Sequence, residues 1–283
     1  MQVVDSVTAI RAKIKEWRRQ HHSIAFIPTM GNLHQGHLSL VAKAQEMADK
    51  VVVSIFVNPL QFDDKADLSA YPRTLDVDIQ QLALGECDLV FTPSAEMIYP
   101  HGMEKHTSVL VPNMDNKLCG RERPGHFDGV ATVVTKLFNM VQADVAVFGE
   151  KDYQQLLLIK QLVQDLAFPI DVIGSPTHRE KNGLAMSSRN QYLSEAQREQ
   201  AAGLYQTLLS VRVQLESGEL NFSSLQKSAV DKLEQLGFLP DYVDIRCASD
   251  LQQAKAGDKS LRILAAAHLG KARLIDNIAC NLA

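Results

Sequence analysis

Strand-like and helix-like patterns of apolar residues alternate along roughly the first 175 positions of the chain. Continuous apolar runs at 24–27, 51–57 and 145–148 predict strands covered on both faces, as the strands of parallel sheets are. Between such runs apolar residues recur at helical spacing, most clearly from Val130 to Val141. This repeated β–α–β order predicts a parallel sheet with right-handed crossovers and with helices on both faces. The same patterns predict further helices at 40–48, 75–83 and 156–166, and further strands at 89–91 and 170–173.

The pattern changes after Pro176. Ser194 and Gln197 have the spacing of a capping box, which predicts a long helix that continues to about Glu216. A second helix is expected over roughly 223–236, and it is followed by short strands at 242–246, 261–267 and 273–276. We therefore expect an α/β chain with two domains, a parallel-sheet domain at 1–176 and a smaller α+β domain at 177–283.

Composition limits the classes of protein that this chain can represent. With 283 residues, of which 46% are hydrophobic and 22% charged, it has the composition of a globular protein with a sizeable core. The net charge of −4 argues against a surface that coats nucleic acid or binds a membrane through basic residues. The longest apolar run, 51–57, is too short to span a bilayer.

The cysteines and the start of the chain predict a location. The first twenty residues are basic and amphipathic without an apolar secretory segment, so no signal peptide is expected. Scattered thiols in a chain of this length suggest a reducing compartment, and we expect them to be structural, buried residues. The cytoplasm is the simplest location. The four cysteines are Cys87, Cys119, Cys247 and Cys280.

The segment His34-Gln35-Gly36-His37 follows the first predicted strand and opens a helical pattern. Two imidazoles three positions apart lie on neighbouring surface of one helical turn, so both can face one ligand. The free N–H groups and the positive end of the helix favour an anion there, typically a phosphate. Gly36 leaves no side chain between the histidines, so a flat group such as adenine could approach the backbone. Taken alone, the pair could also be half of a metal site or two solvated histidines.

Two further polar clusters lie where they could also bind a phosphate. Residues 149–152 come directly after the strand at 145–148, and residues 186–189 lie beside the expected domain junction. Alone, the first would be read as a surface turn and the second as a common triplet with no function. Ligands of parallel sheets bind at the carboxyl ends of the strands, so we expect the loops at 28–37, 58–63 and 149–155 around one crevice. A lysine, hydroxyls and an arginine added to the two histidines would suit a triphosphate.

Other nucleotide and metal motifs are missing from the sequence. Gly31 and Gly36 have the glycine spacing of a P-loop, but His37-Leu38 stands where Lys-Ser/Thr is required. No G-x-G-x-x-G motif follows a strand, which leaves a redox dinucleotide site unsupported. A zinc site would need a third ligand that we cannot nominate, so we expect no metal held by protein side chains.

Six segments, taken together, resemble the pantothenate synthetases, which are also called pantoate–β-alanine ligases. Their order and spacing match, and the resemblance extends to the last predicted strand at 272–276. The segments are 28–37 (PTMGNLHQGH), 54–62 (SIFVNPLQF), 71–74 (YPRT), 123–127 (RPGHF), 148–155 (FGEKDYQQ) and 183–190 (GLAMSSRN).

The resemblance implies a Rossmann-like nucleotidyltransferase domain with a parallel sheet, a smaller C-terminal domain that covers the active site, and a homodimer. It implies the last step of vitamin B5 synthesis, in which (R)-pantoate, β-alanine and ATP give pantothenate, AMP and pyrophosphate. ATP is then a substrate, with Mg²⁺ bound to the triphosphate. The partners would be small molecules, without nucleic acid or membrane.

The resemblance also assigns site residues. His34, His37 and Lys151 would be catalytic, with His37 the proton donor. Gln61 would contact pantoate near the β-alanine position, and Asn58 would also bind substrate. Gln155 would take the hydroxyl and carboxylate of pantoate. The residues implied in ATP binding are Met30, Gly31, Asn32, Leu33, His34, Gln35, Gly36, His37, Gly149, Glu150, Lys151, Asp152, His178, Met186, Ser187, Ser188 and Arg189.

Two positions depart from the family pattern. His178 stands where a small apolar residue often makes a backbone contact to adenine, so the role of its side chain is open. Asp128 stands where a basic residue is common, which puts a phosphate-binding role there in doubt. The other histidines outside the 34–37 pair, His126 among them, are expected to be surface or core residues.

Three alternatives to a ligase are weaker. An enzyme that transfers AMP to a phosphorylated metabolite would need additional cations at its acceptor site, where the loop 58–62 offers amides and apolar surface. An aminoacyl-tRNA synthetase would need a basic face for RNA, which the C-terminal domain lacks. A non-catalytic ATP sensor would not need Gln61 and Gln155 at an acceptor pocket.

Overall fold

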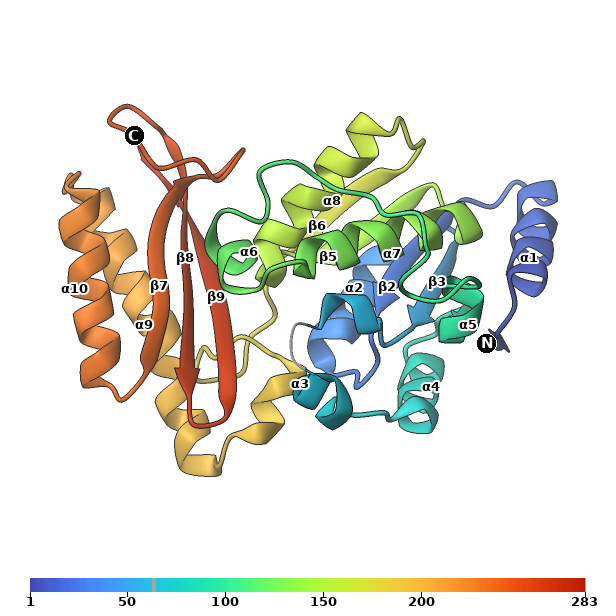
Figure 1. Cartoon of the computed structure of the whole chain (residues 1–283), viewed down its shortest axis with the longest axis horizontal. Coiled ribbons are helices and arrows are strands. Elements are labelled where there is room, and N and C mark those ends of the chain that lie inside the picture. Colours follow the sequence, from blue (N-terminus) through green and yellow to red (C-terminus); the bar gives the residue numbers. More distant parts are fainter. Residues whose placement is uncertain (63–64, 283) are drawn as a thin grey trace. The chain divides into compact units, whose positions relative to one another are not determined.

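The computed structural model describes residues 1–62 and 65–282 of the chain, which divides into two units (Figure 1). The N-terminal unit consists of residues 1–150 and 158–176, and the C-terminal unit of residues 151–157 and 177–283. The segment 151–157, which was predicted to lie before the domain boundary, thus groups with the C-terminal unit. Its contacts explain this: the Asn277 amide donates to the Lys151 carbonyl at 2.9 Å, and the Tyr153 hydroxyl donates to the Ala248 carbonyl at 3.0 Å.

Parallel strands form the sheet of the N-terminal unit in the order β1-β4-β3-β2-β5-β6, of which Figure 1 labels β2, β3, β5 and β6. From β2 the chain builds β3 and β4 on one side and then returns to place β5 and β6 on the other. The strand order therefore reverses between β2 and β5, which pair directly, with Ala25 opposite Val145. Ligands of open parallel sheets bind at the carboxyl ends of the strands beside such a reversal. The strands are β1 Gln2–Val4, β2 Ile24–Thr29, β3 Lys50–Ile55, β4 Leu89–Phe91, β5 Val145–Gly149 and β6 Asp171–Ser175.

Helices cover both faces of this sheet because its central strands are apolar on both sides. Ala25 and Ile27 of β2 pack in one cluster with Val41 of α2. Phe26 points to the opposite face, where its ring meets that of Phe138 in α7, with ring centroids 6.3 Å apart. The helices that lie wholly in this unit are α1 Val7–Arg19, α2 Gln35–Gln45, α3 Lys65–Ala70, α4 Leu75–Leu84, α5 Ala95–Ile98, α6 Leu118–Glu122 and α7 His126–Val141; α8 Tyr153–Asp165 begins in the segment 151–157.

The predicted elements are present, with differences at their ends. The helix expected at 40–48 ends at Gln45, because the chain turns at once to enter β3 at Lys50. The strand expected at 51–57 ends at Ile55, where the chain leaves the sheet for the turn that begins at Asn58. β1 and α1 were not predicted as elements.

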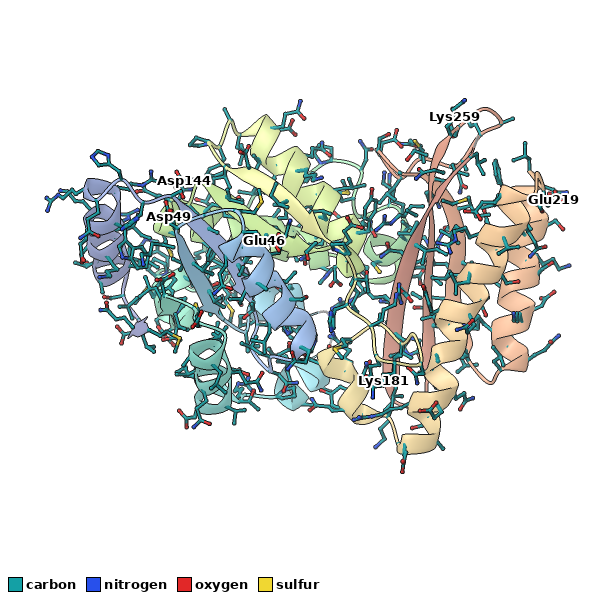
Figure 2. The ribbon with its side chains drawn as sticks, turned by 180° about the vertical axis from the view of Figure 1, so that it is seen from behind. Glu46, Asp49, Asp144, Lys181, Glu219 and Lys259 are labelled. Carbon is teal, nitrogen blue, oxygen red and sulfur yellow. The ribbon has the colours of Figure 1, made fainter. Side chains whose placement is uncertain are left out.

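Acidic side chains fix the amino ends of the central strands. Asp49, just before β3, accepts hydrogen bonds from the backbone N–H and the hydroxyl of Ser23 at 2.8 and 2.7 Å. These bonds, the backbone one first, lower the pKa of Asp49. Asp144, just before β5, accepts from the Ile24 N–H at 2.8 Å. Both carboxylates are labelled in Figure 2, and they mark the sheet edge opposite to the strand carboxyl ends.

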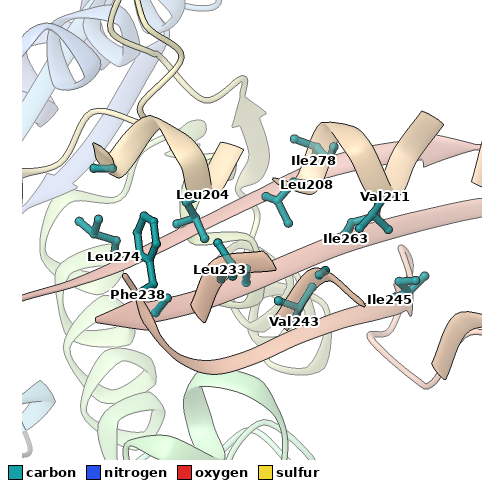
Figure 3. Close-up of a cluster of buried hydrophobic side chains, with 14 of the residues drawn as sticks. Leu204, Leu208, Val211, Leu233, Phe238, Val243, Ile245, Ile263, Leu274 and Ile278 are labelled. Atoms are coloured by element: carbon teal, nitrogen blue, oxygen red, sulfur yellow. The ribbon is translucent and has the colours of Figure 1, made fainter. Parts of the chain in front are cut away.

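The C-terminal unit has an antiparallel sheet in the order β7-β8-β9, with two helices packed against it. The predicted capping box is confirmed, since Ser194 accepts from the Gln197 N–H while the Gln197 side chain accepts from the Ser194 N–H. Figure 3 shows Leu204, Leu208 and Val211 of α9 among the buried apolar side chains of this core. The elements are α9 Glu195–Glu216, α10 Phe222–Gln235, β7 Leu239–Cys247, β8 Ser260–Leu269 and β9 Ala272–Asn281.

The strands of this sheet are longer than predicted, because ladder pairing continues through polar positions such as Ser260 opposite Asn281. The predicted class, a parallel α/β part with a smaller α+β part, is confirmed. Across the described residues, every helix is too short or too polar to cross a bilayer.

The expectation that all four cysteines are buried is only half right. Cys87 and Cys280 are buried, whereas Cys119 and Cys247 are partly exposed. Burial raises the pKa of Cys87 to about 11.

Candidate functional site

The loop after β2 is held by its own side chains and by a glycine. The Thr29 hydroxyl donates to the Ser54 carbonyl at 2.8 Å and accepts from the Gly31 N–H at 3.2 Å. Gly31 has a φ of +79°, and a Cβ there would stand 3.0 Å from both Asp78 and Ile55. Only glycine suits both the left-handed backbone and the tight space.

Asp78 of α4 clamps the same loop from outside. Its carboxylate is 1% exposed and accepts from the backbone N–H groups of Asn32 and Leu33 at 2.9 and 2.8 Å. The Thr74 hydroxyl donates to it at 3.1 Å. Hydrogen bonds to a carboxylate are stronger than neutral ones, so this clamp defines the loop conformation. Asp78 was not among the residues predicted from the sequence, although an acid four residues before Leu82 on an apolar helix face was an available signal.

The two histidines cap helix α2. His34 is the N-cap residue, and its Nδ1 accepts from the Gly36 N–H at 3.1 Å. The Nδ1 of His37 accepts from the His34 N–H at 3.2 Å, and the ring centroids lie 4.1 Å apart. A nitrogen that accepts a hydrogen bond carries no proton, so the neutral form of each ring carries its hydrogen on Nε2 and can donate it. The proximity of the rings agrees with the prediction.

Two details of that prediction are wrong. His34 lies just before the helix and not within its first turn. The first-turn N–H groups are also not all free, because those of Gly36, His37 and Leu38 donate to His34. An anion at this helix end would therefore accept hydrogen bonds mainly from the imidazole Nε2–H groups and less from the backbone N–H groups.

The turn after β3 presents the Gln61 carboxamide. Asn58 is the N-cap residue of the short 3₁₀ helix η1 Pro59–Gln61, and its Nδ2 donates to Gln61 Oε1 at 3.2 Å. The Nε2 of Gln61 points to the Sδ of Met30 at 2.9 Å. The predicted ATP segment and the predicted pantoate residue thus lie in contact within one unit. Asp63, the last residue of the loop predicted at 58–63, lies outside the described residues.

The segment 123–129 supports this turn from the other side. His126 Nδ1 and Arg123 Nη2 lie 2.7 and 3.2 Å from the Gln61 carbonyl oxygen. The helix backbone at Gly129 lies so close that a Cβ there would stand 2.4 Å from the carbonyl oxygen of Leu60. His126, expected to be an ordinary surface or core histidine, is therefore part of the candidate site.

Asp128 in the same segment is a partly buried acid. Burial, and secondly the charge and hydrogen bond of Asp115, raise the pKa of the Asp128 carboxyl. These surroundings disfavour negative charge, which weighs against phosphate binding at this position.

The carboxyl end of β5 completes the N-terminal part of the site. Gly149 ends the strand and Glu150 begins the 3₁₀ helix η2 Glu150–Asp152. A Cβ at Gly149 would meet no atom within 4 Å, so a ligand can approach the backbone there. Since β5 pairs with β2, the loops at 30–34 and 149–150 both follow strands that flank the reversal of strand order.

The C-terminal unit brings a second group of predicted residues together. Lys151 and Ser187 line a small cavity of about 10 Å³, the size of a single water molecule, together with Asn190 and Asp276. Ser187 is the N-cap residue of the 3₁₀ helix η3 Ser188–Tyr192, and its hydroxyl accepts from the Arg189 N–H at 3.3 Å.

Three further predicted residues lie in this unit. The His178 carbonyl accepts from the Met186 N–H at 3.0 Å. Gln155 is partly buried in the first turn of α8. Among the described residues, no group of three or more His, Cys, Asp or Glu side chains is placed to hold a metal.

A family model described as Pantoate-beta-alanine ligase matches residues 2–279. The chain belongs to this family. Pantothenate synthetase of Shewanella loihica is 52% identical over 98% of this chain and 98% of its own length. That of Idiomarina loihiensis is 55% identical over 94% of this chain and 95% of its own.

Solved structures of pantoate–β-alanine ligases have the same fold. The enzyme from Thermus thermophilus superimposes with a TM-score of 0.91 at 42% identity, covering 98% of this chain and 99% of that one. A pantoate–β-alanine ligase from Francisella tularensis, complexed with Beta-gamma ATP and Beta-alanine, has a TM-score of 0.82 at 37% identity and covers 98% and 97%. The family and the ligase activity inferred from the sequence are confirmed.

Proposed function

We propose that this member of the pantoate–β-alanine ligase family joins (R)-pantoate to β-alanine through a pantoyl-adenylate intermediate formed from ATP. The observation that carries the proposal is the contact between Gln61 and Met30, at 2.9 Å from Nε2 to Sδ. The contact places the Gln61 NH₂ group, a hydrogen-bond donor for a small acid, next to the segment that carries His34 and His37. An acid and an α-phosphate must meet in this way for a carboxylate to be adenylated.

The reaction has two displacements. A carboxylate oxygen of pantoate attacks the α-phosphorus of ATP, the bond from that phosphorus to the bridging oxygen breaks, and pyrophosphate leaves. The amine of β-alanine then attacks the acyl carbon, the bond to the AMP oxygen breaks, and the amine loses a proton. Holding the amine beside the acyl carbon removes an entropic barrier of roughly 7–11 kcal/mol at best.

The site residues would act mainly on charge. The Nε2–H groups of His34 and His37 would donate to the α-phosphate, and Lys151 would add a positive charge. Hydroxyl and guanidinium groups of Ser187, Ser188 and Arg189 would hold the β- and γ-phosphates. The other proposed ATP-binding residues are Met30, Gly31, Asn32, Leu33, Gln35, Gly36, Gly149, Glu150, Asp152, His178 and Met186.

For the acid, we propose that Gln61 and Gln155 bind pantoate, with β-alanine next to Gln61. Asn58, also predicted to bind substrate, is 1% exposed and its amide bonds to Gln61 and Gly129, so we propose that it supports Gln61 instead. Mg²⁺ would enter with the triphosphate, whose oxygens bind it, and it would neutralise phosphate charge.

Product analysis tests the proposal. Purified protein with ATP, Mg²⁺, pantoate and β-alanine should give pantothenate, AMP and pyrophosphate in equal amounts. Without β-alanine, it should catalyse exchange of labelled pyrophosphate into ATP only when pantoate is present. Formation of ADP, or exchange that does not need pantoate, would contradict adenylation of this acid. Nucleotide binding without AMP formation would identify an ATP sensor instead.

We further propose a cytoplasmic homodimer composed of domains close to 1–176 and 177–283. In support of a dimer, apolar side chains of α4 are exposed, Leu84 to 86% and Val77 to 51%. Light scattering during size-exclusion chromatography tests the dimer, and a monomer at micromolar concentration would contradict it. Cell fractionation tests the location.

A further inference from the structure

A chain of hydrogen bonds connects Tyr99 to the carboxamide of Gln61. The Tyr99 hydroxyl donates to Asn58 Oδ1 at 2.7 Å, and Asn58 Nδ2 donates to Gln61 Oε1 at 3.2 Å. Asn58 is 1% exposed and Tyr99 is 3% exposed, so the bond between them is shielded from bulk solvent. Every member of this chain belongs to the N-terminal unit.

Two backbone groups fix which way the Asn58 amide points. The Gly129 carbonyl can only accept, and Nδ2 of Asn58 lies 3.1 Å from it. The Leu60 N–H can only donate, and Oδ1 of Asn58 lies 3.4 Å from it. Oδ1 therefore faces Tyr99, and the phenol must be the donor.

The orientation of the Asn58 amide determines the orientation of the Gln61 amide. Its Oε1 is occupied by Asn58, so its NH₂ group points the other way, toward Met30 Sδ. A thioether sulfur is a weak acceptor, and an oxygen of an acid would be a better partner. Gln61 thus offers the candidate site a donor and not an acceptor.

Tyr99 is well placed to hold this arrangement. Its backbone N–H donates to the Ala95 carbonyl at 2.8 Å, which ties it to the end of α5. The ammonium group of Lys136 lies 5.3 Å from the centre of its ring. Burial raises the pKa of the Tyr99 phenol, so the hydroxyl keeps the proton that it donates.

We propose that Tyr99 is a positioning residue that acts through Asn58 to turn the NH₂ group of Gln61 toward the acid substrate. The site would then select acids that present an oxygen acceptor at this point, as the carboxylate of pantoate does. This inference rests on the proposed function, because it takes Gln61 to contact pantoate.

Steady-state kinetics of Tyr99→Phe, with each substrate varied in turn, tests the inference. Loss of one buried hydrogen bond should raise the KM for pantoate roughly five- to tenfold. The KM for ATP should stay within about twofold, because the phenol acts through Asn58 on Gln61, which we place at the acid substrates. Tyr242→Phe, which removes a buried phenol from β7 in the C-terminal unit, is the matched control and should leave all three KM values unchanged.

A double-mutant cycle separates positioning from a general loss of structure. Gln61→Ala should itself raise the KM for pantoate, and Tyr99→Phe in that background should add nothing. Additive effects would overturn the inference. Gln61→Glu, which replaces the donor by an oxygen, should bind pantoate more weakly than wild type, and equal binding would overturn the donor role whether or not Tyr99→Phe folds.

The outcomes also distinguish the two proposals. If Gln61→Ala weakens pantoate binding and a folded Tyr99→Phe does not, the inference fails and the proposed function stands. If Gln61→Ala has no effect on pantoate, the assignment of Gln61 and the inference fail together. If the wild-type protein shows no pantoate-dependent exchange, the proposed function itself is wrong.

Discussion

The backbone N–H of His34 donates to Nδ1 of His37 at 3.2 Å, while Nδ1 of His34 accepts from the Gly36 N–H at 3.1 Å. Each imidazole is therefore a structural cap of α2 through one nitrogen and can be a donor to a ligand through the other. A substitution must separate these two roles before a loss of activity can be assigned to chemistry.

His34→Asn separates them, because asparagine is among the best N-cap residues but has no imidazole. We expect its free energy of unfolding to stay within about 0.5 kcal/mol of wild type and its turnover to fall roughly 10²- to 10³-fold. His34→Ala should lose activity and also about 1 kcal/mol of stability. Urea denaturation and the pyrophosphate exchange assay measure the two effects. Full turnover of a folded His34→Asn protein would remove His34 from the mechanism.

Asp78→Asn should loosen the loop that precedes the histidines. The amide has one oxygen in place of two, so one of the N–H groups of Asn32 and Leu33 would face another donor. We expect a loss of about 1–3 kcal/mol in unfolding free energy and a KM for ATP raised roughly tenfold. Asp76→Asn changes an exposed acid of the same helix and is the control. A KM for ATP equal to that of the control would show that the clamp does not serve the nucleotide site.

Gly129→Ala should displace the turn that carries Gln61. The new methyl group would stand 2.4 Å from the Leu60 carbonyl oxygen and 2.8 Å from the Gln61 nitrogen, both of them backbone atoms that cannot rotate away. We expect a loss of about 1–3 kcal/mol in stability and a higher KM for pantoate. The loss would be notable because alanine normally favours a helix by about 1 kcal/mol over glycine.

Gly85→Ala is the control for this prediction, since its methyl group would meet neighbours at ordinary distances of 3.5 Å or more. Thermal unfolding and pantoate kinetics of both variants provide the measurement. If Gly129→Ala were as stable and as active as Gly85→Ala, the close approach of α7 to the turn would be unimportant.

Asn277→Ala should release the segment that carries Lys151. Asn277 donates to the Lys151 carbonyl at 2.9 Å and accepts from Nε of Arg262 at 2.6 Å. The guanidinium of Arg262 stacks over the Tyr153 ring, 3.8 Å from its centre. We expect a loss of about 1–3 kcal/mol in stability together with a fall in kcat.

Lys151→Met distinguishes the anchoring from the charge, because it removes the ammonium group but keeps the backbone carbonyl that Asn277 holds. Its turnover should fall roughly 10²- to 10³-fold with little change in unfolding temperature. Asn281→Ala, at an exposed position of the same strand, is the control for Asn277→Ala. Full turnover in Lys151→Met would exclude the lysine from catalysis.

The candidate site was only partly visible in the sequence. The segments around His34, Gln61 and Lys151 could be named because they follow predicted strands and resemble family motifs. Tyr99 could not be named, because its partner lies 41 positions away in the chain. Asp78 could have been noticed as an acid on an apolar helix face, but its partner Leu33, 45 positions away, could not be named. No local pattern encodes a hydrogen bond between residues so far apart.

The sequence by itself determined the elements and the family. A strand that is apolar on both faces and a helix with an apolar stripe are local periodicities, and burial of apolar surface turns each into a definite element. The tertiary structure alone decided which loops are clamped, how the Gln61 amide is turned, and that Lys151 is tied to β9. These depend on the geometry of single hydrogen bonds between distant segments, which exist only once the strands have packed in their final order.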